Sequence, residues 1–178
     1  MATVPSPHQF SVGEVVTADN INTYYQGLTF AQNPPICVMY TTVTQTVATG
    51  TLTPLVFNAN YVDTYGGHSL ITNTSRYTSQ VAGYYLASGQ AALNASTAGT
   101  FRFVAWYVNG SPVPPGGALY SPPPISTGIM AALPTILIHL NVNDYLEAYF
   151  EHNTGANYTM SFIASDQQSY VSIEWAHV

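Results

Sequence analysis

Hydrophobic and polar residues alternate with a period of two over most of the chain, which is the pattern of β-strands. From residue 36 onward, alternating segments are separated by short runs of Gly, Asn, Asp and Ser, which favour turns. The predicted strands are 84–90, 101–109, 136–141, 144–152, 158–164 and 170–176. Because no long helical pattern interrupts them, they predict an all-β antiparallel sandwich rather than a parallel α/β sheet.

The alternation also indicates which side chains face the core. In 144–152, Leu146, Ala148 and Phe150 lie on one side, with tyrosines and glutamates on the other. In 101–109, Arg102, Val104, Trp106 and Val108 share one side, while Phe103, Ala105 and Tyr107 occupy the opposite side. We therefore expect this second strand to be covered on both faces.

Two segments have unusual compositions. Residues 41–53 contain seven threonines, whose β-branched side chains favour β structure. Residues 111–125 contain six prolines, which cannot donate to a sheet, so we expect a stiff surface loop that joins no ladder. That loop either packs on a neighbour in an oligomer or presents Leu119 and Tyr120 as an exposed, ligand-contacting tip.

Residues 1–35 differ from the rest and form a predicted N-terminal arm, followed by a sandwich domain over 36–178. Thr17 is placed to cap a helix over 18–28, and Asn33-Pro34-Pro35 ends it. A helix this short is marginal in isolation, so it either packs on its own domain or docks into a different protein. The candidate anchoring residues are the apolar residues of the arm: Phe10, Val15, Val16, Ile21, Tyr24, Tyr25 and Leu28.

Charge is scarce and excludes several classes of function. Asp, Glu, Lys and Arg make up only 6% of the 178 residues, with two arginines, no lysine and a net charge of −6. Binding to nucleic acid or to an anionic membrane needs several cationic side chains, so neither partner is expected. The lone Cys37 excludes an internal disulfide. Residues 128–140 are too short to cross a bilayer and the start lacks the basic opening of a signal peptide, so we expect a soluble protein made in a cytoplasm.

Candidate catalytic groups are sparse. Asp63, His68 and Ser69 lie close in sequence, but a turn stabilised by Asp63 explains them better than a catalytic triad. Glu147 and Glu151 would stand about 13 Å apart along one strand, too far for the paired carboxylates of a glycosidase. We therefore predict a non-enzymatic protein with no catalytic residues, no cofactor and no metal site.

The 14 tyrosines are the more informative side chains. Tyrosine combines a large apolar ring with a hydroxyl, and with so few charges an aromatic face is expected to be covered by another subunit. The candidate interface residues are Tyr84, Tyr107, His139, Tyr145 and Tyr149. Stacking on carbohydrate is the competing use of such rings.

Several motifs resemble known families. Residues 81–90, which contain Gly83, Tyr85 and Gly89, resemble the "G-x-Y-x-x-x-G" strand of complement-globular-domain and tumour-necrosis-factor-like jelly rolls. Residues 108–110 resemble their "NG" hairpin, and 140–150 resemble their "L-x-x-G-D" stretch, with Asn143 in place of the usual glycine. Residues 10–22 and 61–69 resemble segments of structural proteins from tailed bacteriophages.

The resemblance implies a homotrimeric jelly roll on a phage virion, assembled in the host cytoplasm and held by its N-terminal arm. The arm would bind a capsid or tail protein, and the five candidate interface residues would line the trimer contact. The implied function is a capsid decoration or head-fibre protein without enzymatic activity. The alternative is a tail-associated receptor-binding module that recognises host cell-surface polysaccharide.

Overall fold

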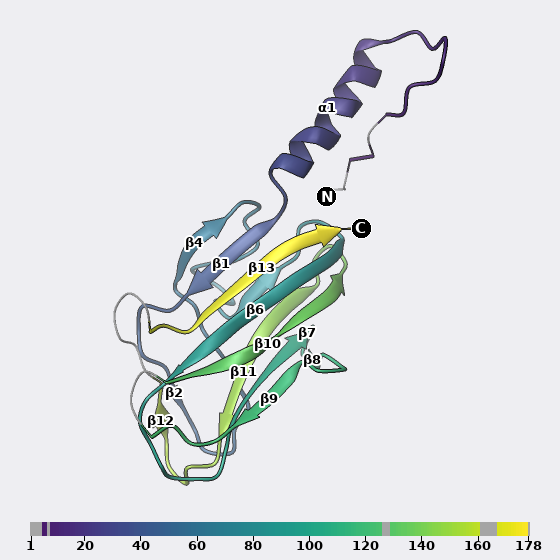
Figure 1. Ribbon diagram of the computed structural model, residues 1–178. Helices are drawn as coiled ribbons and strands as arrows, with labels where there is room; N and C mark the ends of the chain where they lie inside the picture. Colours follow the sequence, from purple (N-terminus) through teal and green to yellow (C-terminus); the bar gives the residue numbers. More distant parts are fainter. Residues whose placement is uncertain (1–4, 7, 126–128, 161–166, 178) are drawn as a thin grey trace.

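The computed structural model describes residues 5–177 except 7, 126–128 and 161–166. It is a sandwich of two antiparallel sheets from which one helix projects (Figure 1). The elements are α1 (Ala18–Gln32), β1 (Ile36–Tyr40), β2 (Thr46–Val47), β3 (Thr53–Pro54), β4 (Ala59–Asp63), β5 (Arg76–Thr78), β6 (Gly83–Leu93), β7 (Arg102–Val108), β8 (Ser111–Pro112), β9 (Ala118–Ser121), β10 (Ile129–Leu140), β11 (Tyr145–His152), β12 (Tyr158–Thr159) and β13 (Tyr170–His177).

The strands divide between two main sheets. The five-stranded sheet has the order β10-β6-β13-β1-β4, and the six-stranded sheet has the path β3-β11-β7-β8, with β5 also on β11 and β9 also on β7. A two-stranded ladder of β2 and β12 closes one end. The pairs join strands far apart in sequence, as in β1 with β13 and β6 with β13, which is the crossed connectivity of a jelly roll.

The core lies between the sheets and follows the predicted alternation. Leu146, Ala148 and Phe150 of β11 are fully buried, as predicted. Trp106 of β7 is also fully buried, and its indole Nε1 donates to the Pro134 carbonyl of the facing sheet at 2.7 Å. A buried indole N–H requires such a partner, and this bond links the two sheets within the core.

Strand β7 is covered less evenly than predicted. Arg102, Val104 and Trp106 point into the core as expected. On the other side, Phe103 and Tyr107 are only half-buried and are shielded by neighbouring rings rather than by a further layer of structure.

Four of the predicted strands are found close to their expected bounds, as β6, β7, β11 and β13. Strand β10 begins seven residues earlier than predicted, and its register on β6 shifts between Leu133 and Ile136. The shift surrounds Pro134, which lacks the N–H needed for a regular ladder and is tolerated at a bulge. Of the predicted strand 158–164, residues 158–159 form β12 and 161–164 lie outside the described residues.

The threonine-rich segment 41–53 is mostly irregular, with only β2 and the first residue of β3 in a ladder. Two of its hydroxyl groups bond to nearby backbone instead: Thr41 Oγ1 donates to the Val43 carbonyl and Thr53 Oγ1 to the Thr51 carbonyl, both two residues away. Such local bonds compete with strand pairing. β-Branching was therefore a misleading signal for this segment.

The prediction that residues 111–125 join no ladder is wrong. Both β8 and β9 pair with β7, and β9 extends the edge of the six-stranded sheet from Ala118↔Ala105 to Ser121↔Arg102. Residues 118–121 contain no proline, because the six prolines fall on either side of them. The prolines thus limit the length of this edge strand without preventing it.

The turns use residues that tolerate a left-handed backbone. Asn109 and Gly110, with φ of 51° and 77°, connect β7 to β8 and form the tight hairpin that the "NG" motif predicts. Asn143 has φ of 72° in the corner between β10 and β11. Asparagine is the side chain that most readily replaces glycine in this conformation, which explains why it fits where the resembled jelly-roll sequences usually carry glycine.

Arg102, the first residue of β7, is fully buried. Its guanidinium donates to three backbone carbonyls, those of Phe101 at 2.8 Å, Ser96 at 3.1 Å and Ala98 at 3.2 Å. It also lies 4.9 Å from the centre of the Tyr158 ring. This side chain therefore stabilises the loop between β6 and β7.

Candidate functional site

The arm helix begins where the sequence predicts and ends later. Thr17 is the N-cap, and its Oγ1 accepts a hydrogen bond from the Asn20 backbone N–H at 3.2 Å. The helix continues to Gln32, four residues past the predicted end, and stops just before Asn33-Pro34-Pro35. The extra turn includes Phe30, which provides the attachment to the sandwich.

Only this last turn of α1 is docked. Phe30 is 9% exposed, and its ring packs edge-to-face on Trp175 of β13 and on Tyr65, with centroids 4.9 and 6.3 Å apart. The Trp175 backbone N–H donates to the Pro35 carbonyl at 2.9 Å, which ties the linker after the helix to the same strand. The helix therefore leaves the sandwich at a fixed point.

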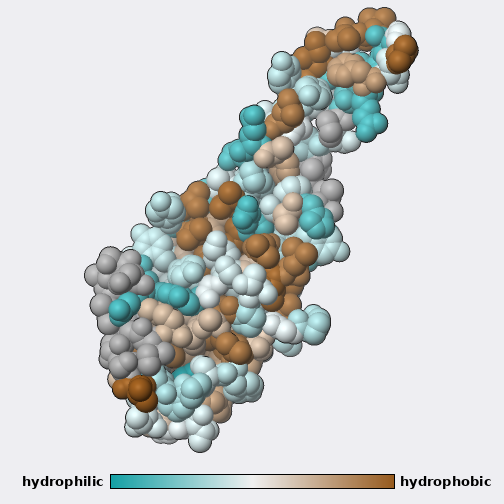
Figure 2. Space-filling view, viewed as in Figure 1, coloured by the Kyte–Doolittle hydropathy of each residue, from teal (hydrophilic) through white to brown (hydrophobic). Residues whose placement is uncertain are grey.

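The remainder of the helix projects away from the sandwich (Figure 1), so the expectation that the helix packs on its own domain holds only for its last turn. All seven candidate anchoring residues are exposed, from 39% for Ile21 to 77% for Val15. Figure 2 shows hydrophobic residues gathered at the far end of the arm. An exposed apolar stripe on a helix this short normally lies against a partner.

The segment before the helix folds back along it and contributes to the same surface. The Phe10 ring lies 6.3 Å from that of Tyr24. The carboxylate of Glu14 accepts hydrogen bonds from the Ser11 backbone N–H at 2.9 Å and from Asn20 Nδ2 at 2.7 Å. The bond from Ser11 in particular holds the pKa of Glu14 below its ordinary value. The tip of the arm is therefore a structured loop.

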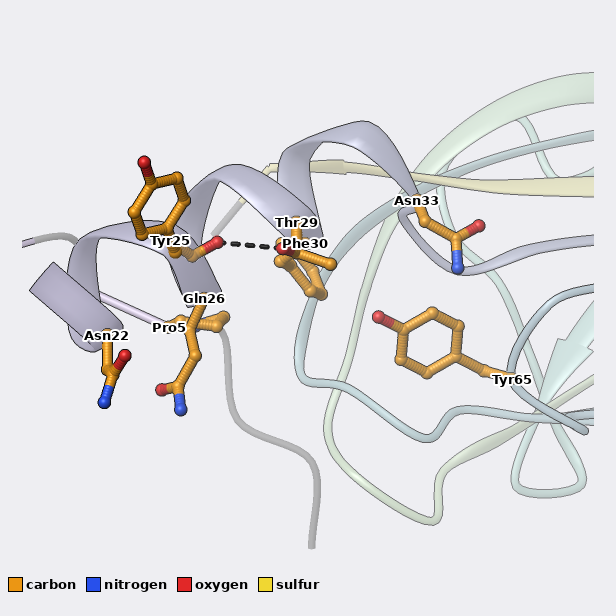
Figure 3. Close-up of a pocket in the computed structure, with 8 residues that line it drawn as sticks. All are labelled: Pro5, Asn22, Tyr25, Gln26, Thr29, Phe30, Asn33 and Tyr65. Atoms are coloured by element: carbon orange, nitrogen blue, oxygen red, sulfur yellow. Dashed lines mark hydrogen bonds between the residues drawn. The ribbon is translucent and has the colours of Figure 1, made fainter.

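A groove of about 510 Å³ lies where the arm meets the sandwich (Figure 3). Helix α1 forms one wall, and Tyr65, from the β4–β5 connection, forms another. The lining residues are Pro5, Asn22, Tyr25, Gln26, Thr29, Phe30, Asn33 and Tyr65. Amide and hydroxyl groups alternate with rings here, so the groove could accept a chain segment with both polar and apolar groups.

The outer face of the five-stranded sheet carries a second apolar surface. Leu86 and Leu137 are 44% and 56% exposed and lie directly opposite each other on β6 and β10. Tyr84 and His139 are the next outward pair, with ring centroids 5.1 Å apart. Figure 2 looks onto this face and shows hydrophobic residues gathered at the end of the sheet nearest α1. We call these four residues the sheet patch.

The other three candidate interface residues lie on the outer face of the opposite sheet. The rings of Tyr107 and Tyr149 are 4.3 Å apart, and the Tyr145 ring lies beneath the guanidinium of Arg76 at 3.9 Å. The structure therefore divides the five residues between two sheets. All five lie on an outer face, where Tyr107, Tyr145 and Tyr149 are half-buried, but they do not form one continuous surface.

The candidate tip residues lie on the edge strand β9 rather than on a loop. Leu119 and Tyr120 are 43% and 67% exposed. The Tyr120 ring packs against Phe103, with centroids 4.6 Å apart, and against Phe101 at 5.4 Å. These three rings form an aromatic cluster beside a sheet edge.

The side chains considered for catalysis have structural roles. Asp63 accepts hydrogen bonds from the Gly67 and His68 backbone N–H groups, as the turn interpretation predicts. His68 bonds through its ring to Asn60 and to the Thr74 carbonyl, while the Ser69 hydroxyl accepts from the Ile71 and Thr72 backbone. Within the described residues, no group of three or more His, Cys, Asp or Glu side chains is placed to hold a metal ion. No described helix is long and apolar enough to span a membrane.

Sequence reasoning missed several residues of these surfaces. Leu86 and Leu137 share the outward alternation of Tyr84 and His139, so the same period-two pattern would have found them. Phe30 and Tyr65 carry no local signal, because their contact joins segments 35 residues apart in sequence. Glu147, expected on an exposed face, is only 3% exposed.

Comparison with solved structures supports the fold. Crystal structures of murine APRIL at pH 5.0 and at pH 8.0 each align with 80% of this chain and 98% of their own, with a TM-score of 0.54 and 10% sequence identity. No protein-family model matches the chain, and no curated protein matches it. The chain thus has the antiparallel jelly-roll fold of the tumour-necrosis-factor-like type, as the sequence resemblance predicts.

Proposed function

We propose that the protein is a structural component of a phage virion, a homotrimeric capsid decoration or head-fibre protein that its N-terminal arm attaches to a capsid or tail protein. The observation that carries the proposal is the arm. An arm fixed at one end by Phe30 projects from the body with seven apolar side chains uncovered, four of them on the helix. The resemblance of residues 10–22 to phage structural proteins supports this assignment.

The sheet patch supports self-association. Leu86 and Leu137 are directly paired and flanked by Tyr84 and His139, on a chain with few charges to keep such a face hydrated. A contiguous apolar face of this kind is typical of subunit contacts. In a cyclic trimer the same contact would form three times, which multiplies a modest area per contact.

The oligomeric state is the first test. Light scattering after size-exclusion chromatography of the full chain should give three times the chain mass of 19.2 kDa. Leu137→Asp should yield folded monomers, because it places a charge in the contact. Leu119→Asp, which makes the same change on the opposite sheet, should remain trimeric. A wild-type monomer at micromolar concentration would exclude the trimer.

The attachment site is tested separately. The assay uses particles of the encoding phage that were prepared without this protein, and measures whether added protein co-sediments with them. The protein carrying both Ile21→Asp and Leu28→Asp should remain trimeric but fail to co-sediment. Tyr61→Asp, which introduces the same charge at an 84% exposed position outside the arm, should co-sediment like wild type. Equal co-sedimentation of the arm variant would remove the arm from the attachment.

A second candidate function is recognition of host cell-surface polysaccharide, and the aromatic cluster on β9 favours it. An exposed ring supported by two others is a suitable platform for stacking on a sugar. Glycan binding by the purified chain that is lost on Tyr120→Ala and kept on Tyr61→Ala would establish this function. Absence of binding to polysaccharide from the phage's host would exclude it.

A further inference from the structure

A second cavity, of about 260 Å³, lies beside strand β5 and belongs to none of the surfaces described above. Its lining residues are Gly66, Gly67, Ser69, Thr72, Asn73, Arg76, Thr78 and Gln80. None of these has an apolar side chain, and together they provide hydroxyl, amide and guanidinium groups. The volume is slightly below the roughly 300–1,000 Å³ of pockets for drug-sized ligands, so it suits a single small polar unit.

Arg76 is the arginine that can meet a ligand, since Arg102 is fully buried and the chain has no lysine. The Arg76 side chain is 34% exposed and is held from two directions. Its Nε donates to the Glu147 carboxylate at 3.1 Å, and its guanidinium carbon lies 3.9 Å from the centre of the Tyr145 ring. The guanidinium is therefore oriented before any ligand arrives.

Glu147 is itself held in place. It is 3% exposed, and its Oε1 also accepts a hydrogen bond from the Ser75 hydroxyl at 2.6 Å. The Tyr149 hydroxyl donates to its other oxygen at 3.3 Å. These bonds prevent the carboxylate from turning toward the second edge of the guanidinium.

That second edge is open. A guanidinium has five N–H donors, and Glu147 takes the one on Nε. The Nη1 and Nη2 groups of Arg76 have no hydrogen-bond partner among the described residues. Two parallel N–H groups of this kind match the two oxygens of a carboxylate.

We propose that this cavity binds the carboxylate of an acidic sugar unit, such as a uronic acid, with Arg76 as the anion receptor. The sugar's hydroxyl groups would meet Ser69, Thr72 and the Gln80 amide, which can both donate and accept hydrogen bonds. The cavity shares no residue with the arm, the sheet patch or the β9 cluster, so the inference does not rest on the proposed function.

A sugar fits the walls better than the other carriers of a carboxylate do. A peptide terminus would bring an apolar or bulky side chain, for which the cavity has no apolar wall. Inorganic phosphate could also accept hydrogen bonds from the hydroxyl and amide N–H groups, but it carries at most one donor and so leaves most of the acceptor oxygens of the lining without a partner. The protein's own charge of −6 disfavours small anions in general, so the additional hydrogen bonds of a sugar are needed for selectivity.

Calorimetric titration of the full chain at physiological salt tests the proposal with four probes: methyl glucuronoside, methyl glucoside, inorganic phosphate and an acetylated dipeptide acid. We expect the glucuronoside to bind with a millimolar Kd, at least roughly tenfold tighter than each of the others. Binding of phosphate or the dipeptide as tight as that of the glucuronoside would overturn the sugar assignment. Equal binding of the neutral glucoside would overturn the role of the carboxylate.

Variants then locate the site. Gln80→Glu places a negative charge in the cavity while leaving Arg76 and Glu147 intact, and it should weaken glucuronoside binding at least roughly tenfold. Asn157→Asp makes the same amide-to-acid change at an exposed position beyond the other end of β11 and should bind like wild type. Arg76→Gln should abolish binding. The thermal unfolding of this variant is measured in parallel. Unchanged binding in Gln80→Glu would exclude this cavity as the site.

Discussion

Replacing Phe30 with alanine should release the arm from the sandwich. The ring is almost fully buried between Trp175 and Tyr65. An aromatic side chain buries roughly 150 Å² or more, and at about 25 cal/mol per Å² this gives about 4 kcal/mol as an upper estimate. Because alanine keeps part of the contact, we expect Phe30→Ala to weaken docking by about 3 kcal/mol, or roughly a hundredfold in the docking equilibrium.

Hydrogen exchange read by mass spectrometry measures this effect directly. A released helix of 15 residues is marginally stable, so amides of α1 should lose protection by up to roughly a hundredfold. Amides of β6 and β11 should exchange as in wild type, because the core of the sandwich does not include Phe30. Trp175 fluorescence should shift as well, since the ring covering its indole is removed.

The control is Phe10→Ala, which removes the same side chain from the exposed part of the arm. It should leave the protection of residues near Phe30 unchanged. If Phe30→Ala and wild type exchange α1 amides at the same rate, the helix is not held through Phe30 and the reasoning fails.

Three further predictions concern the buried residues Arg102, Glu147 and Cys37. Arg102→Leu leaves three backbone carbonyls without their donor and should lower the free energy of unfolding by about 3 kcal/mol in urea titrations; a loss below about 1 kcal/mol would contradict this role. Burial, and then the negative charge of Glu147, raise the pKa of Tyr149, so Glu147→Gln should lower that pKa, while leaving it above the ordinary value, in NMR titrations of isotope-labelled tyrosine. Burial raises the pKa of the Cys37 thiol to about 12, so at pH 8 a thiol reagent should label the unfolded chain and spare the native one; rapid labelling of native protein would refute this.

The features that the sequence predicted well depend on neighbours a few residues away. The inward side of β11, the Thr17 cap and the Asn109-Gly110 turn each follow from local periodicity or from the conformational preference of one or two residues. The jelly-roll fold itself was predicted from motif resemblance rather than from periodicity. Local patterns identify strands but do not show which strands become neighbours.

The parts that the sequence did not predict depend on contacts between distant segments. Alternation placed Tyr149 on the side of its strand away from the core, and Tyr84 was chosen for its ring, but only the sheet order shows that the two residues lie on different sheets. The pairing of Arg76 with Glu147 joins β5 to β11 across 71 residues, and no local signal marks it. The edge strand β9 was missed because proline content was averaged over a window wider than the strand.

The place where the helix joins the body determines how the molecule would respond to a mechanical load. A pull on the helix passes through the short linker to Ile36 and along the axis of β1. That strand is bonded on both sides, to β13 and to β4. Force applied along a strand strains all of its cross-strand bonds at once, whereas force applied across it breaks them one at a time. A molecule pulled by its arm would therefore be loaded along its strands, which is the direction in which a sheet resists extension most strongly.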